Sequence, residues 1–301
     1  QEYMEKNPKI LCIGSMLWDV IGRSSIAMQV GSDVPGHITR LPGGVAMNIA
    51  MTLRNFGLRP ALLSVIGQDR AGKDLIKLAK DFDLDISYLY RSHDLPTDQY
   101  MAIEGSNGVI AAVADAHSLE AAGNKILEPL SNGQLGTSIN PFSGVIALDG
   151  NLTTELITEI SSSVLFASSD LRVAPASPGK AERLIPLLTH KGATFYANVK
   201  EAELLCQKEF LSAEAASRGL VDRGAHRAVV TDGPKAAALA DQNGFVTAMP
   251  PYALATKLTG AGDTFMAAHI AAELSGTTRE ISLQSAANAA SNYVSGKSGN
   301  K

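Results

Sequence analysis

Strand-like and helix-like segments alternate along most of this 301-residue chain, and this alternation constrains the fold more than any other feature. Short apolar runs, which are typical of buried strands, are followed by segments whose apolar residues recur with helical spacing. The strand-like runs include KILCIG (9–14), PALLSVIG (60–67), SGVIALDG (143–150), LRVAPAS (171–177) and ATFYAN (193–198). The helix-like segments include GVAMNIAMTLRNFG (44–57), which stops at Gly57, GKAERLIPLLTH (179–190) and VKEAELLC (199–206). Repeated strand–helix units predict an α/β fold in which helices cover both faces of a mostly parallel sheet.

Two stretches interrupt this rhythm. Residues 20–44 and 97–115 contain short extended runs separated by Gly, Asn and Ser turns, with no helix between them. We expect antiparallel strands here, added to the parallel core. Segments of about 20–41 and 97–115 would then project as a small lid from a single domain that spans residues 1–301, since no linker divides the chain.

Charge and composition exclude several classes of function. A formal net charge of −4 supplies no basic field for a nucleic acid or an anionic membrane surface, so we expect neither partner. No apolar run is long enough to span a bilayer, and QEYMEKNPK (1–9) is too polar for a signal peptide. Cys12 and Cys206 lie in apolar settings without CxxC spacing, which is typical of buried free thiols in a reducing compartment. We therefore expect a cytoplasmic protein.

The segment LTGAGDTFMAAHIAAEL (258–274) carries the first chemical signal, because three small residues precede a carboxylate at the start of a helix. Helix N-termini offer unpaired N–H groups to phosphate, and Gly260, Ala261 and Gly262 would leave that backbone accessible. Asp263 would repel a phosphate, but it suits a general base that takes a proton from a hydroxyl attacking that phosphate. The alternative is an Asp that merely caps a helix after a glycine-rich turn.

Six motifs in order decide between these alternatives. They are GS-x-x-x-D (14–19), GG-x-x-x-N (43–48), V-x-G-x-D-x-x-G (65–72), N-x-x-E (198–201), T-x-G (231–233) and GAGD (260–263). In this order and over nearly the whole chain, the sequence resembles the ribokinase-like (PfkB) carbohydrate kinases. The resemblance implies a three-layer α/β/α core with a β lid, and an enzyme that uses ATP and Mg²⁺.

The resemblance also assigns roles to individual residues. Asp263 matches the catalytic base, and the backbone of Gly260, Ala261, Gly262 and Asp263 matches the hole that binds the transferred phosphoryl group. The positions that match those binding the other hydroxyls of the sugar are Asp19, Gly43, Gly44 and Asn48. Read alone, Asp19 could equally be a polar strand end and Asn48 a solvent-facing helix residue.

The nucleotide end of the site is matched by a second group. Asn198 and Glu201 match the pair that steers Mg²⁺ through water, although their spacing also fits a capping box at a helix start. Thr231 and Gly233 match positions that line the nucleotide, and the adenine would lie between Thr256 and the last helix, near Asn288.

The chain departs from the family pattern at three places. Lys257-Leu258-Thr259 stands where Asp-Thr-Thr is common, so we expect no strong activation by a monovalent cation through this side chain. Leu17 replaces an Asn that contacts the sugar, and Ala174-Pro175 replaces an Asp-Pro. Loss of one polar contact to a bound hydroxyl costs ~1–3 kcal/mol, which favours a substrate other than ribose.

Residues 100–123, 144–157 and 173–184 are most similar to the pseudouridine kinase branch of the family. In this interpretation Asp115 and Asn151, at strand ends, face the substrate, whereas His117 reads as a surface histidine. Lids of this family often pair across a dimer, so we expect a homodimer through the lid.

Rival interpretations remain to be compared. GQDRAGK (67–73) fits a P-loop pattern but continues with Asp74 where a Ser or Thr is required. GSMLWD (14–19) lacks the G-x-G-x-x-G of a nicotinamide site, and six scattered histidines form no HExxH motif. Two alternatives stay open: another sugar kinase of the ribokinase, fructokinase or adenosine kinase type, and a non-catalytic nucleoside-binding regulator. The sequence favours an ATP-dependent kinase that acts on a primary hydroxyl of a sugar or nucleoside.

Overall fold

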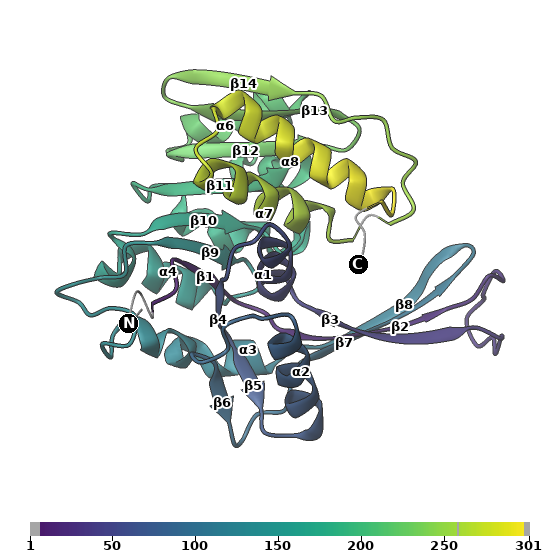
Figure 1. Ribbon diagram of the computed structural model, residues 1–301. Helices are drawn as coiled ribbons and strands as arrows, with labels where there is room; N and C mark the ends of the chain where they lie inside the picture. The colour runs from purple at the N-terminus through teal and green to yellow at the C-terminus, as the bar shows by residue number, and fades with distance from the viewer. Residues whose placement is uncertain (1–6, 258, 298–301) are drawn as a thin grey trace.

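The main sheet has eight strands and runs through the centre of the molecule (Figure 1). A computed structural model describes residues 7–257 and 259–297. In spatial order the strands are β14 (Gly244–Ala248), β13 (Lys235–Asp241), β12 (Arg227–Asp232), β11 (Ala193–Asn198), β10 (Asp170–Ala174), β9 (Val145–Asp149), β1 (Ile10–Ile13) and β4 (Ala61–Leu63). All neighbouring pairs from β4 to β12 are parallel, and only β12–β13 and β13–β14 are antiparallel. The predicted mostly parallel sheet is confirmed.

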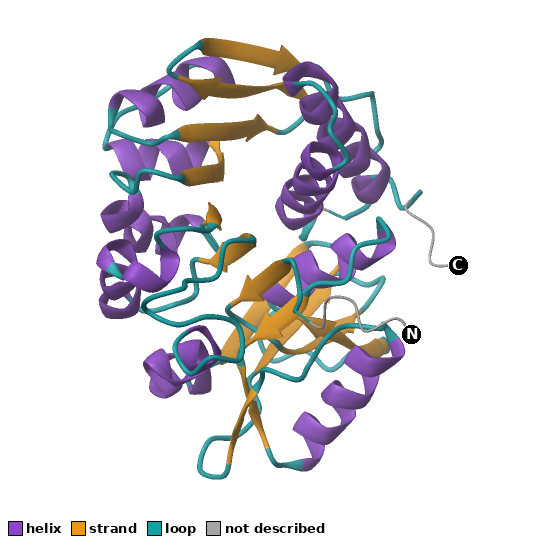
Figure 2. Ribbon diagram, turned by 60° about the vertical axis from the view of Figure 1, so that its left-hand side comes forward, coloured by secondary structure: helices purple, strands orange, loops and turns teal. Residues whose placement is uncertain are grey.

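Helices cover both faces of this sheet (Figure 2). One face carries α1 (Val45–Asn55), α2 (Arg70–Asp81), α7 (Ala261–Leu274) and α8 (Arg279–Val294). The other carries α3 (Ser118–Ala122), α4 (Thr154–Ser162), α5 (Val199–Cys206), α6 (Ala213–Asp222) and the 3₁₀ segments η1 (Gly123–Leu130), η2 (Val164–Phe166) and η3 (Pro178–Leu187). The structure therefore has the three-layer α/β/α arrangement.

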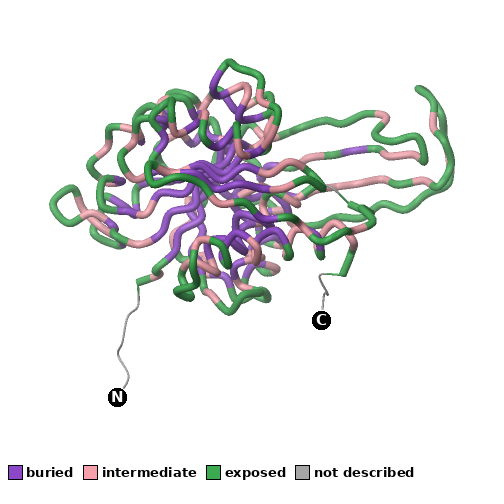
Figure 3. The backbone as a smooth tube through the Cα atoms, turned by 90° about the horizontal axis from the view of Figure 1, so that it is seen from above, coloured by how far each residue is buried: buried purple, intermediate pink, exposed green. Residues whose placement is uncertain are grey.

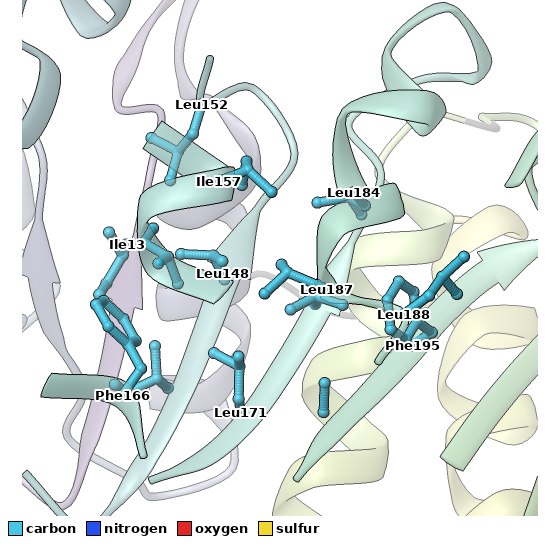
Figure 4. Close-up of a cluster of buried hydrophobic side chains, with 14 of the residues drawn as sticks. Ile13, Leu148, Leu152, Ile157, Phe166, Leu171, Leu184, Leu187, Leu188 and Phe195 are labelled. Carbon is cyan, nitrogen blue, oxygen red and sulfur yellow. The ribbon is translucent and has the colours of Figure 1, made fainter. Parts of the chain in front are cut away.

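The two apolar cores follow from the alternation of side chains along the strands. In β1, Leu11 and Ile13 enter one core, while Ile10 and Cys12 enter the other. Figure 4 shows part of the first core, in which Ile13, Leu148 and Phe166 lie close together beside Leu171. Burial of both faces explains why the strand sequences read as continuous apolar runs. Cys12 and Cys206 are buried free cysteines.

Local details refine the predicted elements. Helix α1 is followed by Gly57 at φ +83°, the left-handed exit that the sequence indicates. The helix expected over 179–190 forms instead as η3, which contains Pro186; a proline has no N–H to donate to a preceding turn. The strand expected over 60–67 divides at Ser64 into β4 and β5 (Val65–Gly67), because the Ser64 carbonyl accepts from Tyr90 of β6 (Tyr90–Ser92), the partner strand of β5.

The lid is a four-stranded sheet that projects from the α/β body (Figures 1 and 3). Its spatial order is β3 (His37–Gly43), β2 (Leu17–Arg23), β7 (Gln99–Gly105) and β8 (Gly108–Asp115). Two antiparallel hairpins form, as expected, and they meet along the parallel pair β2–β7. At the root of the lid, Trp18 of β2 donates to the Ala71 carbonyl of α2 at 2.9 Å and Arg40 of β3 pairs with Asp74 of α2, whereas most residues of β3 and β8 are exposed.

Within the described ranges, we find no helix with the length and apolar character needed to cross a membrane.

Candidate active site

A cavity of about 810 Å³ opens at the carboxyl ends of the parallel strands, beside the root of the lid. This edge is where open α/β sheets bind ligands. The predicted site residues that line it are Asp19, Gly44, Asn48, Asn151, Asn198, Glu201, Thr231, Gly233, Gly260, Ala261, Gly262 and Asp263. Residues as far apart in the sequence as Asp19 and Asp263, separated by 244 positions, are therefore brought to one cavity.

Three predicted residues stand apart from the lining. Gly43 packs against Asp19 from behind, so closely that a Cβ at this position would collide with the carboxylate. Asp115 is exposed at the end of β8, between the lining residues Ala114 and Ala116. Asn288 lies on the exposed side of α8, where its Oδ1 accepts a hydrogen bond of 3.0 Å from Gln284. The exposed His117 precedes α3 and does not belong to the lining either.

The start of α7 presents bare backbone to the cavity. Gly260 precedes the helix at φ +90°, a conformation that favours glycine. Gly262, in the first turn, is exposed, and a Cβ built on it would meet no atom within 4 Å. The first N–H groups of α7 have no partner within the helix and carry its partial positive charge. This geometry suits an anion.

Asp263 lies beside these N–H groups and contacts Asn48. Nδ2 of Asn48 donates to Oδ2 of Asp263 at 3.0 Å, which joins the first turn of α1 to that of α7. Burial raises the pKa of Asp263 to about 7, the Asn48 hydrogen bond lowers it, and the charges of Asp149 and Glu201 raise it further. A carboxylate with a pKa near neutrality is suited to take a proton from a hydroxyl.

Asp19 faces the cavity from β2. Burial raises the pKa of its carboxyl to about 6. Gly43 leaves room for this carboxylate, and Gly44, at φ +91°, starts α1 where a Cβ would collide with the backbone of Ser15. The two glycines thus allow β3, β2 and α1 to approach closely enough for Asp19 and Asn48 to share one cavity.

A buried carboxylate that sequence reasoning missed organises the floor of the site. Asp149, fully buried at the end of β9, accepts from the N–H of Ser15 at 2.8 Å, the Ser15 hydroxyl at 2.7 Å and the N–H of Ala46 at 3.2 Å. Its other oxygen accepts from the N–H and the Nδ2 of Asn151, both at 2.8 Å. Burial raises the pKa of Asp149, and these hydrogen bonds lower it. An acid that directly ends a buried strand was the available signal.

Lys180 was also missed. Its Nζ donates to Oδ1 of Asn151 at 2.7 Å, and the Asn151 amide in turn donates to Ser15 and Asp149. The Asn151 side chain is therefore occupied by protein partners at both ends. Lys180 is the only basic residue that lines the cavity within the described part of the chain.

Asn198 and Glu201 form the capping box that their spacing allows. The Asn198 side chain accepts from the Glu201 N–H at 2.8 Å, and Oε1 of Glu201 accepts from the Asn198 N–H at 3.0 Å. Glu201 is 9% exposed, and burial raises its pKa. Among the described residues no group of three or more His, Cys, Asp or Glu side chains could hold a metal directly. A single carboxylate in the lining of the cavity fits Mg²⁺, because this ion keeps several waters and is bound through one or two carboxylates together with substrate phosphates.

The P-loop-like segment (67–73) forms a capped helix start held by Asp69. Asp69 caps α2 by accepting from the N–H of Gly72 at 2.9 Å, and it also accepts from the N–H and hydroxyl of Thr97 at 2.9 and 2.6 Å. An acid therefore occupies the place of a phosphate in this loop, and it holds the root of β7.

Comparison with known proteins identifies the family. The family model described as pfkB family carbohydrate kinase matches residues 7–301. The chain belongs to this family. The structure of Arabidopsis thaliana ribokinase complexed with ribose and ATP has a similar fold, with a TM-score of 0.75 and 20% identity over 96% of this chain and 92% of that one.

Curated relatives within the PfkB family are distant. An uncharacterized sugar kinase of Escherichia coli, YeiI, is 32% identical over 48% of this chain, but that alignment covers only 39% of the relative's length. E. coli pseudouridine kinase is 26% identical over 88% of this chain and 83% of its own length. Mouse ribokinase is 24% identical over 88% of this chain and 81% of its own length.

Proposed function

We propose that this protein transfers the γ-phosphoryl group of ATP to a primary hydroxyl of a neutral nucleoside or sugar, with pseudouridine as the first candidate. The observation that carries the proposal is the placement of Asp263 beside the open backbone of Gly262, in one cavity with Asp19 and Asn48. Base, anion-binding backbone and hydroxyl-binding side chains are the parts that phosphoryl transfer to an alcohol needs.

In the proposed reaction, the oxygen of the acceptor hydroxyl attacks the γ-phosphorus, and the Asp263 carboxylate accepts the proton of that hydroxyl. The new O–P bond forms while the bond to the β-phosphate oxygen breaks, so that ADP leaves and the proton resides on Asp263. The N–H groups at the start of α7 donate to the phosphoryl oxygens, where negative charge increases. Asn48 keeps the Asp263 carboxylate aimed at the cavity.

Asn198 and Glu201 would hold Mg²⁺ through its water ligands at the phosphate end. The ion supplies neutralisation of charge on the ATP phosphates. Glu201 uses Oε1 in the capping box, so Oε2 is available for a metal-bound water.

Charge favours a neutral acceptor. The acids Asp19, Asp98 and Glu120 line the cavity; Glu120 is paired with Arg183 at 3.1 Å, and Lys180 is the only basic residue of the described lining. A sugar that already carries a phosphate would bring two negative charges to these carboxylates without a cluster of basic partners. Neutral nucleosides and neutral sugars meet no such repulsion.

Pseudouridine is favoured over ribose by two observations. The segments that resemble pseudouridine kinases lie at the lid and at strand ends around the cavity, and E. coli pseudouridine kinase is 26% identical over 88% of this chain, against 24% over 88% for mouse ribokinase. Leu17 lines the cavity where an amide would offer a sugar a hydrogen bond. Another sugar kinase activity is the alternative, since mouse ribokinase aligns over a similar length.

We further propose that the protein forms a homodimer through the outer face of the lid. Tyr100 and Asp19 line the cavity, so their neighbours Met101 and Val20 point to the opposite face. There, Met101, Val113 and Ile38 are 49%, 65% and 80% exposed. Arg40, the cross-strand partner of Val20, lies on the same face, but its guanidinium already stacks over Trp18 and pairs with Asp74 at 3.6 Å. A second copy could therefore cover the apolar side chains without burying an unpaired charge.

The function is tested by measuring ADP release from Mg·ATP with pseudouridine, uridine, adenosine, ribose, fructose and 2-keto-3-deoxygluconate. Asp263→Ala serves as the blank and should lower kcat by ~10²–10⁴-fold, the usual contribution of a general base, while nucleotide affinity is retained. Equal turnover by the wild type and Asp263→Ala would refute the assignment of the base. Turnover of ribose but not of pseudouridine would keep the kinase and replace its substrate. Nucleoside binding without turnover would favour a non-catalytic regulator.

A further inference from the structure

The turn that leads into α7 is fastened to the end of α8. The N–H groups of Thr256 and Lys257 both donate to the carbonyl of Val294, at 2.7 and 3.3 Å, and the Thr256 hydroxyl donates to the same oxygen at 3.1 Å. The neighbouring residue, Tyr293, reaches further along the turn, and its hydroxyl donates to the carbonyl of Thr259 at 2.5 Å. Leu258 lies outside the described residues.

Tyr293 also defines the space beside Gly260. A Cβ built on Gly260 would collide with the Tyr293 hydroxyl, and the Tyr293 Cζ would stand 3.0 Å from it. Gly260 holds φ +90°, and its carbonyl accepts the first helical hydrogen bond of α7, from Thr264 at 3.0 Å. The phenol therefore contacts both the peptide before Gly260 and Gly260 itself.

Lys257 contacts the face of the Tyr293 ring. Its ammonium lies over the Tyr293 ring, 4.1 Å from the ring centroid, a geometry in which a cation is attracted to the π face. Tyr293 is thus contacted by Lys257 at the face of its ring and by Thr259 at its hydroxyl. Burial raises the pKa of Tyr293, and the nearby Asp263 carboxylate raises it further, so the phenol stays protonated and able to donate.

We propose that Tyr293 is a positioning residue for phosphoryl transfer: by clamping Thr259 and Gly260 it fixes the turn from which the N–H groups of α7 point into the cavity. Lys257 supports the clamp. The effect on turnover rests on the proposed kinase function, but the order of the turn can be measured without any substrate.

A matched pair of variants separates positioning from simple anchoring. Tyr293→Phe removes only the hydroxyl that bonds Thr259. Ser291→Ala, also on α8, removes a hydroxyl that bonds the carbonyl of Pro251 at 3.0 Å, and Pro251 belongs to the same β14–α7 connection. Both variants lose one hydrogen bond between α8 and this connection, but only Tyr293 touches the residue that starts α7.

The first measurement is steady-state kinetics with the substrate that the wild type uses best. Tyr293→Phe should lower kcat by roughly tenfold with the acceptor KM changed less than about twofold, because misplaced N–H donors weaken interactions made in the transition state. Ser291→Ala should keep kcat within about twofold of the wild type. Equal kcat for Tyr293→Phe and the wild type, or equal losses in both variants, would overturn the proposal.

The second measurement is hydrogen–deuterium exchange of the peptide over residues 256–266 in the protein without ligands. Exchange should be faster in Tyr293→Phe than in the wild type and unchanged in Ser291→Ala; identical exchange in all three proteins would overturn the proposal. If the wild type turns over no substrate of the panel, the proposed function fails, and exchange still decides whether Tyr293 orders the turn.

Discussion

At the scale of single residues, the titration of Asp263 offers a direct test of its role. Its pKa is raised to about 7, and a general base works only when it is deprotonated. We therefore expect kcat/KM to rise with pH through about 7 and to level off above it. The measurement is a pH–rate profile for the best acceptor.

Two variants show whether this midpoint belongs to Asp263. Glu201→Gln removes a charge that raises the pKa of Asp263, so the midpoint should move to lower pH. Asn48→Ala removes a hydrogen bond that lowers the pKa, so the midpoint should move to higher pH. Titration of the ATP phosphates would not respond in opposite directions. Shifts of the same sign in both variants would contradict the assignment.

Gly262 provides a second test at this scale, because replacing it with a larger residue should stabilise the fold but hinder binding of the ligand. A Cβ at Gly262 would meet no protein atom within 4 Å, and Ala is favoured over Gly in a helix by about 0.5–1 kcal/mol. Gly262→Ala should therefore raise the melting temperature slightly. The methyl group would nevertheless enter the space that we propose for the phosphate oxygens, so kcat/KM for ATP should fall by roughly tenfold or more. Thermal unfolding and kinetics measure the two effects, and full activity would argue against phosphate binding at Gly262.

Most of the predicted site residues line the cavity, whereas the sequence did not identify the buried residues that hold them in place. Asn48 and Asp263 were assigned separately, and the structure joins them by a hydrogen bond. Asp149 could not be assigned, since its partners Ser15 and Ala46 precede it by 134 and 103 positions and only the parallel sheet brings them together. Asn288 was placed by resemblance near the adenine and lies on an exposed helix surface, outside the lining of the cavity.

At the scale of elements, α7 is held at both ends. Its start meets Asn48 and Tyr293, and its last turn carries Glu273, which accepts from Arg172 at 2.7 Å and from Arg227 at 2.6 and 2.8 Å. One turn earlier, the fully buried His269 contacts the Tyr196 hydroxyl at 2.7 Å. These contacts tie the helix to β10, β11 and β12, so its axis is fixed relative to the sheet.

This cluster predicts a specific loss of stability in mild acid. Burial lowers the pKa of His269 from 6.5 to about 4; the Glu273 charge raises it, and the charges of Arg172 and Arg227 lower it further. Between these values the unfolded chain binds a proton that the folded protein does not, so the free energy of unfolding falls as pH decreases from 6.5 toward 4. The full effect is on the order of 3 kcal/mol.

Denaturant unfolding at several pH values between 7 and 4 measures this loss. His269→Gln should show a shallower decrease than the wild type, because its side chain does not titrate. Parallel decreases in both proteins would contradict the prediction.

Glu273 contributes to stability down to a lower pH. Burial raises its pKa, but its arginine partners lower it to about 2, so its contribution to stability is lost only as pH falls from 4.5 toward 2.

At the scale of the whole molecule, the sequence predicted the layers and the lid because each depends on a local pattern. Continuous apolar runs gave the buried strands, and alternating extended runs gave the lid hairpins. The parallel pairing of β2 with β7 could not be read in this way, since it joins residues about 80 positions apart and depends on how both hairpins leave the body. The division of 60–67 into two strands likewise depends on a distant partner, Tyr90.

The outer face of the lid carries the last prediction. If two copies pack through this face, the wild type should have a mass of about 63 kDa, twice 31.6 kDa, in light scattering coupled to size exclusion. Met101→Glu places a charge between Val20 and Val113, in the apolar part of this face, where a dimer would have to bury it, and should give a monomer. Leu211→Glu is the matched control, since Leu211 is 99% exposed on the α/β body, and it should leave the mass unchanged. A wild type that remains monomeric at micromolar concentration, or a Met101→Glu variant that stays dimeric, would exclude this face as the interface.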